Sequence, residues 1–116
     1  MTDITIYHNP RCSKSRAALA LIDNKTDNLT VVEYLKTPPS LETLKQIIEL
    51  LGFNSARQLM RTNEDIYKTL ALKDVQDEEK LLQVMLENPK LIERPIVLAN
   101  GKAAIGRPPE SVLDII

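Results

Sequence analysis

The 116-residue sequence has few of the residues around which many binding sites are built. It contains one cysteine, one histidine, no tryptophan and only 3% aromatic residues. A single thiol excludes an internal disulfide and multi-cysteine zinc or iron–sulfur sites. The scarcity of aromatic side chains argues against a base-stacking platform or an aromatic ligand cage. A formal net charge of −1 argues against a surface made for nucleic acid or anionic lipid.

Long hydrophobic runs are also missing. The longest, residues 17–22, is far shorter than the ~20 residues that a membrane span needs. The N-terminus lacks a basic segment followed by an apolar one, so we expect no signal peptide and a cytoplasmic location. The length and the apolar and charged fractions, 43% and 27%, are typical of one globular domain, predicted over residues 1–116.

The first third of the chain predicts a βαβ unit. Residues 4–7 and 31–34 are rich in β-branched and aromatic side chains, and each predicts a strand. Residues 13–24, dense in Ala and Leu, predict the helix between them. This order implies two parallel strands joined by a right-handed crossover.

The middle of the chain is predicted to be a helical insertion of four segments. Each begins at a residue typical of a helix N-cap: Ser40, Ser55, Thr62 and Asp77. We expect the first segment to end at Gly52, the third near Leu72 and the last before Pro89.

The C-terminal part predicts a β-hairpin and a final helix. Residues 96–99 and 102–105 are the strands, joined by Asn100-Gly101, whose residues favour a turn with positive φ. Residues 110–116 are the helix. Together these elements predict an α/β protein with a mixed four-stranded sheet flanked by helices, the outline of a thioredoxin-like fold. In that fold the position of Pro95 usually carries a cis peptide bond.

The most informative segment is residues 8–16, which surround Cys12 between the first strand and the first helix. A thiol at a helix N-terminus faces unpaired N–H groups and the positive end of the helix dipole, and both favour the thiolate. Arg11, Lys14 and Arg16 add positive charge that lowers the pKa of the thiol. The same N–H groups can hold an oxyanion. A lone cysteine is most often a buried, inert side chain, but these polar neighbours argue against that interpretation.

His8 and Ser15 are candidates for supporting the thiolate. His8 precedes Cys12 by four residues and is either a neighbour of the sulfur or a solvent-facing strand residue. Ser15, one helical turn after Cys12, can donate a hydrogen bond to the sulfur, or it is an ordinary first-turn serine. Because Ser15 stands where Cys-x-x-Cys would have its second thiol, an independent dithiol cycle is excluded.

Four arginines outside this loop are candidates for binding an oxyanion. Arg94 and Arg107 each precede a proline at the boundary of a predicted element. Arginine suits a tetrahedral anion because its planar fork carries two parallel donors and a permanent charge. Arg57 and Arg61 are four residues apart and share a helix face, and periodicity does not decide which of them points inward.

The run His8-Asn9-Pro10-Arg11-Cys12-Ser13-Lys14-Ser15-Arg16 resembles the active-site motif of the glutaredoxin-dependent arsenate reductases, the ArsC family. The resemblance covers nearly the whole chain and extends to Arg94-Pro95-Ile96, to Arg107-Pro108 and to residues 56–61. It implies a nucleophilic Cys12 supported by His8 and Ser15. It also implies a three-arginine oxyanion site of Arg61, Arg94 and Arg107, in which Arg61 aligns better than Arg57.

The resemblance implies reduction of arsenate to arsenite in the course of arsenic detoxification. Glutathione would serve as co-substrate and glutaredoxin as the partner that regenerates the thiol, with no metal or bound cofactor. Two alternatives stay open. One is a related glutathione-linked thiol oxidoreductase acting on another substrate. The other is a regulator similar to the Spx proteins, which bind RNA polymerase; these usually carry Cys-x-x-Cys, which Ser15 interrupts here.

Overall fold

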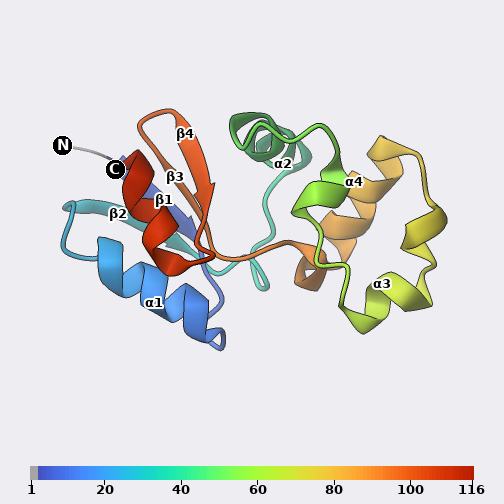
Figure 1. Ribbon diagram of the computed structural model, residues 1–116, viewed down its shortest axis with the longest axis horizontal. Helices are drawn as coiled ribbons and strands as arrows, with labels where there is room; N and C mark the ends of the chain where they lie inside the picture. Colours follow the sequence, from blue (N-terminus) through green and yellow to red (C-terminus); the bar gives the residue numbers. More distant parts are fainter. Residues whose placement is uncertain (1–2) are drawn as a thin grey trace. The chain divides into compact units, whose positions relative to one another are not determined.

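The computed structural model describes residues 3–116. Two strands from the N-terminal part of the chain and two from the C-terminal part form one four-stranded mixed sheet (Figure 1). In the order β2-β1-β3-β4, its strands are β2 (Asn28–Val32), β1 (Asp3–Tyr7), β3 (Ile96–Ala99) and β4 (Lys102–Ile105). β1 is parallel to β2 and antiparallel to β3, and β3 is antiparallel to β4. A parallel pair with a crossover helix, followed by a terminal hairpin, is the predicted thioredoxin-like arrangement.

The chain divides into two units. We call residues 3–37 and Arg94–Ile116 the sheet unit, and Pro38–Glu93 the helical unit. The single domain expected over residues 1–116 stays a prediction, and Met1 and Thr2, with which it begins, lie outside the described residues.

In the sheet unit, helix α1 (Ser13–Ile22) and the 3-10 helix η4 (Pro109–Ile115) lie side by side on one face of the sheet (Figure 1). Strand side chains alternate between faces, so every second residue of β1 and β3 points to these helices. The resulting core consists of Ile4, Ile6, Ala18, Ile22, Val97, Ala99 and Val112. Each large aliphatic side chain buried there contributes about 1.5–3 kcal/mol. This packing fixes the N-terminus of α1 at the end of β1.

The strand register places the open end of the β3–β4 hairpin at one end of the sheet and its turn at the other. Tyr7 pairs with Ile96, and Ile96 pairs with Ile105, so the segments that precede β3 and follow β4 lie at the same end of the sheet as the end of β1. At the far end, Asn100 and Gly101 adopt the predicted positive φ values of 55° and 71°. The Arg94–Pro95 bond is cis, as the fold predicted, and the Arg107–Pro108 bond is also cis, which was not predicted.

The helical unit contains α2 (Leu41–Leu50), α3 (Asp65–Thr69) and α4 (Glu78–Glu87), with 3-10 helices η1 (Ala56–Leu59), η2 (Leu72–Asp74) and η3 (Pro89–Leu91). The Ser40 and Asp77 side chains cap α2 and α4 as predicted, and Ser55 with Gln58 forms the predicted capping box. The third predicted segment is wrong at both ends, because Glu64 occupies the N-cap position and the helix ends at Thr69.

Some boundaries and one helix type in the sheet unit also differ from the prediction. β2 covers residues 28–32 instead of 31–34, and the predicted last strand residue, Tyr34, is buried just beyond it. α1 ends at Ile22 instead of residue 24, and the last helix is a 3-10 helix. Within residues 3–116, no helix is both long and apolar enough to cross a membrane.

Candidate active site

The loop before α1 holds Cys12 at the N-cap of the helix, with an extended backbone (φ −94°, ψ 124°). The Cys12 N–H donates to the Asn9 carbonyl at 3.0 Å, and the Arg11 N–H donates to Asn9 Oδ1 at 3.0 Å. The Arg16 side chain donates from Nη1 to the Pro10 carbonyl at 2.8 Å. Backbone and side-chain bonds thus hold the partly exposed thiol in one place at the start of the helix.

A buried polar pair lies beside this loop. His8 is 6% exposed and Ser15 is fully buried, and His8 Nδ1 lies 2.6 Å from Ser15 Oγ. Ser15 Oγ also accepts the Asn9 N–H at 3.0 Å. Burial lowers the pKa of His8 and the charge of Arg16 adds to this, while the Glu33 carboxylate opposes both. The neutral imidazole is therefore favoured, and the hydroxyl of Ser15 is bonded to His8 and Asn9.

Several opposing influences set the pKa of Cys12. Burial raises it, but hydrogen bonds from the backbone N–H groups of Ser15 and Lys14 lower it. The charge of Arg94 and a hydrogen bond from its side chain lower it further, and the net pKa lies below that of an ordinary thiol. Ser15 thus supports the thiolate through its backbone, while its side chain holds His8 and the loop. The geometry suits a nucleophile, because the thiolate is the reactive form of cysteine.

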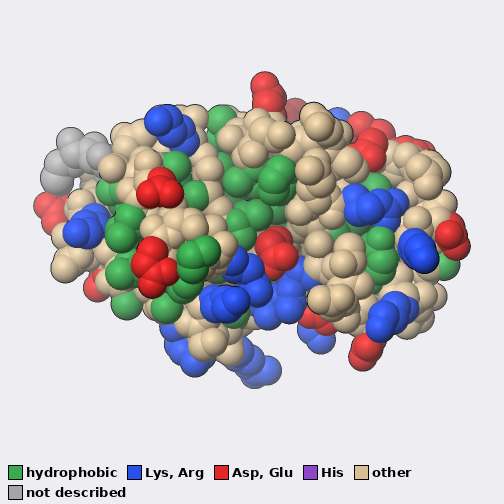
Figure 2. All heavy atoms as spheres, in the orientation of Figure 1, with side chains coloured by type: hydrophobic (Ala, Val, Ile, Leu, Met, Phe, Trp, Pro, Cys, Tyr) green, Lys and Arg blue, Asp and Glu red, His purple; other side chains and the backbone are tan. Residues whose placement is uncertain are grey.

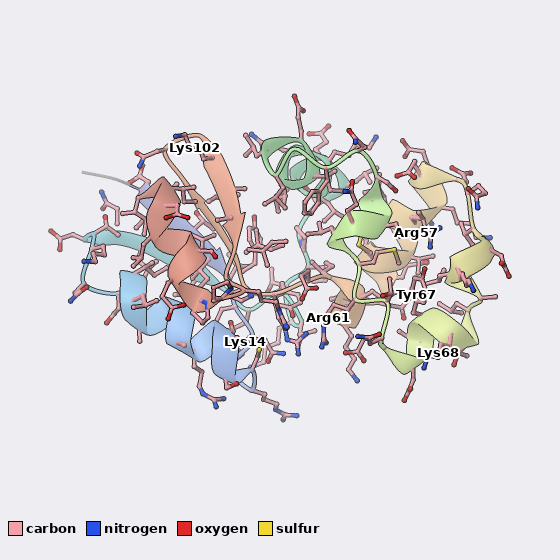
Figure 3. The ribbon with its side chains drawn as sticks, viewed as in Figure 1. Lys14, Arg57, Arg61, Tyr67, Lys68 and Lys102 are labelled. Atoms are coloured by element: carbon pink, nitrogen blue, oxygen red, sulfur yellow. The ribbon has the colours of Figure 1, made fainter. Side chains whose placement is uncertain are left out.

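The cation that acts on Cys12 comes from outside the loop. Arg94, which precedes β3, lies at the end of the sheet where β1 leads to Cys12. The side chains of Arg11, Lys14 and Arg16, expected from the sequence to lower this pKa by their charge, are exposed. Figure 2 shows Lys and Arg side chains gathered over the N-terminal end of α1, and Figure 3 places Lys14 there. Solvent screens such exposed charges, so Lys14 contributes through its backbone instead.

Arg94 and Arg107 belong to one packed structure at this end of the sheet. Arg107 Nε donates to the Arg94 carbonyl at 2.9 Å, and the Gly106 N–H donates to the Pro95 carbonyl at 2.9 Å. A Cβ on Gly106 would lie 2.7 Å from Pro95 Cγ and 3.3 Å from Ala18 Cβ. Only glycine allows this approach, which locks the Arg94 and Arg107 segments against α1. This role of Gly106 could not be predicted from the sequence, because it depends on the strand register.

The other two arginine candidates lie in the helical unit and have different partners (Figure 3). Arg57 donates to the Tyr67 hydroxyl at 2.5 Å and to the backbone carbonyls of Leu72 and Val75. Arg61 instead pairs with the carboxylates of Glu64 and Glu93. Arg57 is therefore a cross-link within its unit, whereas an anion could compete with Glu64 and Glu93 for the Arg61 guanidinium. The assignment of Arg61 as the third substrate arginine stays a prediction.

Comparison with known proteins agrees with the motif. The sequence profile of the ArsC family matches residues 7–115. The chain belongs to the ArsC family. The match includes both units and every arginine discussed above.

Relatives within the ArsC family align over nearly the full length of this chain. An uncharacterised Escherichia coli K12 protein, YfgD, is 57% identical over 114 residues, covering 97% of this chain and 96% of its own. An arsenate reductase of Neisseria meningitidis serogroup A is 53% identical over 113 residues, covering 97% of each. The structure of an arsenate reductase from Vibrio cholerae has 51% identity and a TM-score of 0.93, covering 99% of this chain and 98% of its own.

The lowered pKa of the ArsC-type cysteine has a direct test. We expect the rate of Cys12 alkylation by iodoacetamide to titrate below the ~8.5 of a free cysteine. Replacing Arg94 with alanine should move the inflection upward, because both influences of Arg94 lower the pKa. An inflection at or above the free value in the unmodified protein would contradict an activated thiol.

The same pKa difference predicts how stability depends on pH. Because the folded pKa of Cys12 lies below the unfolded one, the thiolate stabilises the fold fully above the unfolded pKa. That contribution is lost as the pH falls through the folded pKa. As the pH rises from the folded to the unfolded pKa of Cys12, the free energy of unfolding of the wild type should therefore increase relative to that of Cys12→Ser. Urea titrations at a series of pH values measure this difference.

Proposed function

We propose that the protein is a cytoplasmic arsenate reductase that uses the Cys12 thiolate as its nucleophile. The lowered pKa of Cys12 at the N-cap of α1, beside the Arg94 guanidinium, is the observation that carries this proposal. Arg94 and Arg107 flank the same end of the sheet, where both can bind the oxyanion together with the first-turn N–H groups. Arg61 stays the third arginine that the family resemblance implies.

The first step forms an arsenic–sulfur bond. The Cys12 thiolate attacks arsenic, and one arsenate hydroxyl takes up a proton and leaves as water. Arsenic remains As(V) in this adduct. The arginines neutralise the anion, so the thiolate can approach it without the full cost of like-charge repulsion.

The second step reduces arsenic. A glutathione thiolate attacks Sγ of Cys12, a disulfide forms and the arsenic–sulfur bond breaks. The electron pair of that bond stays on arsenic, which becomes As(III) and leaves, after protonation, as arsenite. Cys12 then carries glutathione as a mixed disulfide.

The third step needs a second protein, because the chain has no other cysteine. A glutaredoxin thiolate attacks the glutathione sulfur, and Cys12 leaves as the thiolate. We propose no metal or bound cofactor, since each step uses only thiols, protons and the oxyanion. The cytoplasm, where thiol reductants are maintained, is the compartment that suits this cycle.

A coupled assay tests the proposal. The protein is mixed with arsenate, glutathione, glutaredoxin, glutathione reductase and NADPH, and we expect NADPH oxidation that requires arsenate and glutaredoxin together. Oxidation that proceeds equally without arsenate would instead favour a glutathione-linked oxidoreductase with another substrate. Omitting only glutaredoxin separates the need for this partner from the chemistry at arsenic.

A further inference from the structure

A cavity of about 310 Å³ lies between the loop residues that precede Cys12 and the segment that follows β2. One wall is the loop itself, including Pro10 and Arg11, and the other is the segment after β2, with Glu33, Leu35 and Lys36. Both walls belong to the sheet unit. Arg11, which lines the cavity, directly precedes Cys12 in the chain, so the cavity begins next to the residue that carries the nucleophile.

The cavity is lined by charged side chains of both signs. Two cations, Arg11 and Lys36, and one anion, Glu33, face the same space, together with the apolar surfaces of Pro10 and Leu35. Leu35 is 40% exposed, so part of its apolar surface is open to a ligand. Lys36 and Glu33 form an exposed ion pair of 3.7 Å, and such pairs contribute little and are readily exchanged for ligand contacts.

We propose that this cavity, the Arg11–Lys36 cavity, binds glutathione and presents its sulfur to Cys12. The inference rests on the proposed function, which requires glutathione as a reactant. At neutral pH glutathione carries two carboxylates and one ammonium group, and the cavity offers two cations and one carboxylate. Its volume is within the range of small-ligand sites, about 300–1,000 Å³.

A second cavity beside the loop fits the tripeptide less well. It has a volume of about 400 Å³ and is lined by His8, Pro10, Arg16, Leu19, Ala20 and Asp23. Arg16 is its single cation, and the Arg16 side chain already donates to the Pro10 carbonyl. Of these two cavities beside the loop, the Arg11–Lys36 cavity is the one that offers two cationic partners for two carboxylates.

Disulfide exchange tests the inference without arsenate. The Cys12 thiolate attacks oxidised glutathione, forming the mixed disulfide and releasing one glutathione thiolate, and mass spectrometry follows the adduct. Bis(2-hydroxyethyl) disulfide, which is uncharged, reports the intrinsic reactivity of Cys12 in each variant. The ratio of the two rate constants measures recognition of the tripeptide.

Reversing the charge of Lys36 should lower this ratio. We expect Lys36→Glu to slow the reaction with oxidised glutathione about tenfold and to leave the uncharged disulfide unaffected. The matched control is Lys102→Glu, the same charge change at the opposite end of the sheet, which should alter neither rate. Equal ratios for Lys36→Glu and wild type would overturn the inference.

Glu33→Gln separates a binding site from general attraction. This change makes the protein less negative, so long-range attraction alone predicts faster reaction with the anionic disulfide. Loss of the ammonium contact predicts a slower one, and a faster reaction would count against the site. If wild type does not reduce arsenate while Lys36→Glu still lowers the ratio, the proposed function fails and the cavity assignment stands.

Discussion

Replacing Cys12 with serine is expected to abolish arsenate-dependent NADPH oxidation, with a loss of at least about 10⁴-fold, the scale seen when an essential nucleophile is removed. The hydroxyl of serine is not ionised at neutral pH, so the backbone N–H groups of Lys14 and Ser15 and the Arg94 guanidinium have no anion to stabilise. No other thiol in the chain can substitute for Cys12. The assay is the coupled one described above.

The fold should survive this substitution, because the Cys12 side chain is partly exposed and its backbone, not its sulfur, holds the loop. We expect the free energy of unfolding at pH 6 to change by about 0.5 kcal/mol or less. Ser13→Ala changes an exposed residue in the first turn of α1. It is the control for expression and purification of a variant, and it should retain activity. Turnover by a folded Cys12→Ser protein would remove Cys12 from the mechanism.

The elements predicted best from the sequence are those with a local signature. The Asn100-Gly101 turn, the Ser40 cap and the capping box of Ser55 all depend on residues within a few positions of each other. The prediction of β2 failed because β-branched and aromatic side chains were taken to mark the limits of the strand. Tyr34 is buried but follows the strand, whose limits are set by pairing with β1, from Asp3 opposite Asn28 to Tyr7 opposite Val32.

The candidate site shows the same division between local and long-range information. The position of Cys12 at the start of α1 and its raised acidity could be predicted from the loop alone. Periodicity could not predict that Arg94 supplies the charge, or that Gly106 leaves room for Pro95, because both follow from the register of β1 with β3 and β4. The buried bond between His8 and Ser15 likewise depends on where α1 packs.

Arg94 is the residue whose loss should do most damage after that of Cys12. Its side chain hydrogen-bonds the nucleophile, and its backbone carbonyl accepts a bond from Arg107. We expect Arg94→Ala to lower kcat/KM for arsenate about 10²–10³-fold, the range for removing one preorganised donor from a charged site. Arg94→Lys should recover part of the thiolate acidity but little of the arsenate binding, because lysine keeps the charge and loses the planar fork.

Alkylation in the presence of arsenate separates these two roles of Arg94. In wild type, bound arsenate should cover Cys12 and slow its reaction with iodoacetamide. Arg94→Lys should leave Cys12 reactive but poorly protected. Lys25→Ala, which removes an exposed cation from the turn after α1, should be protected like wild type. Full protection of both Arg94 variants, with unchanged kcat/KM, would exclude Arg94 from the oxyanion site. If both Arg94 variants are fully protected but their Cys12 pKa is raised, the role of Arg94 is limited to stabilising the thiolate.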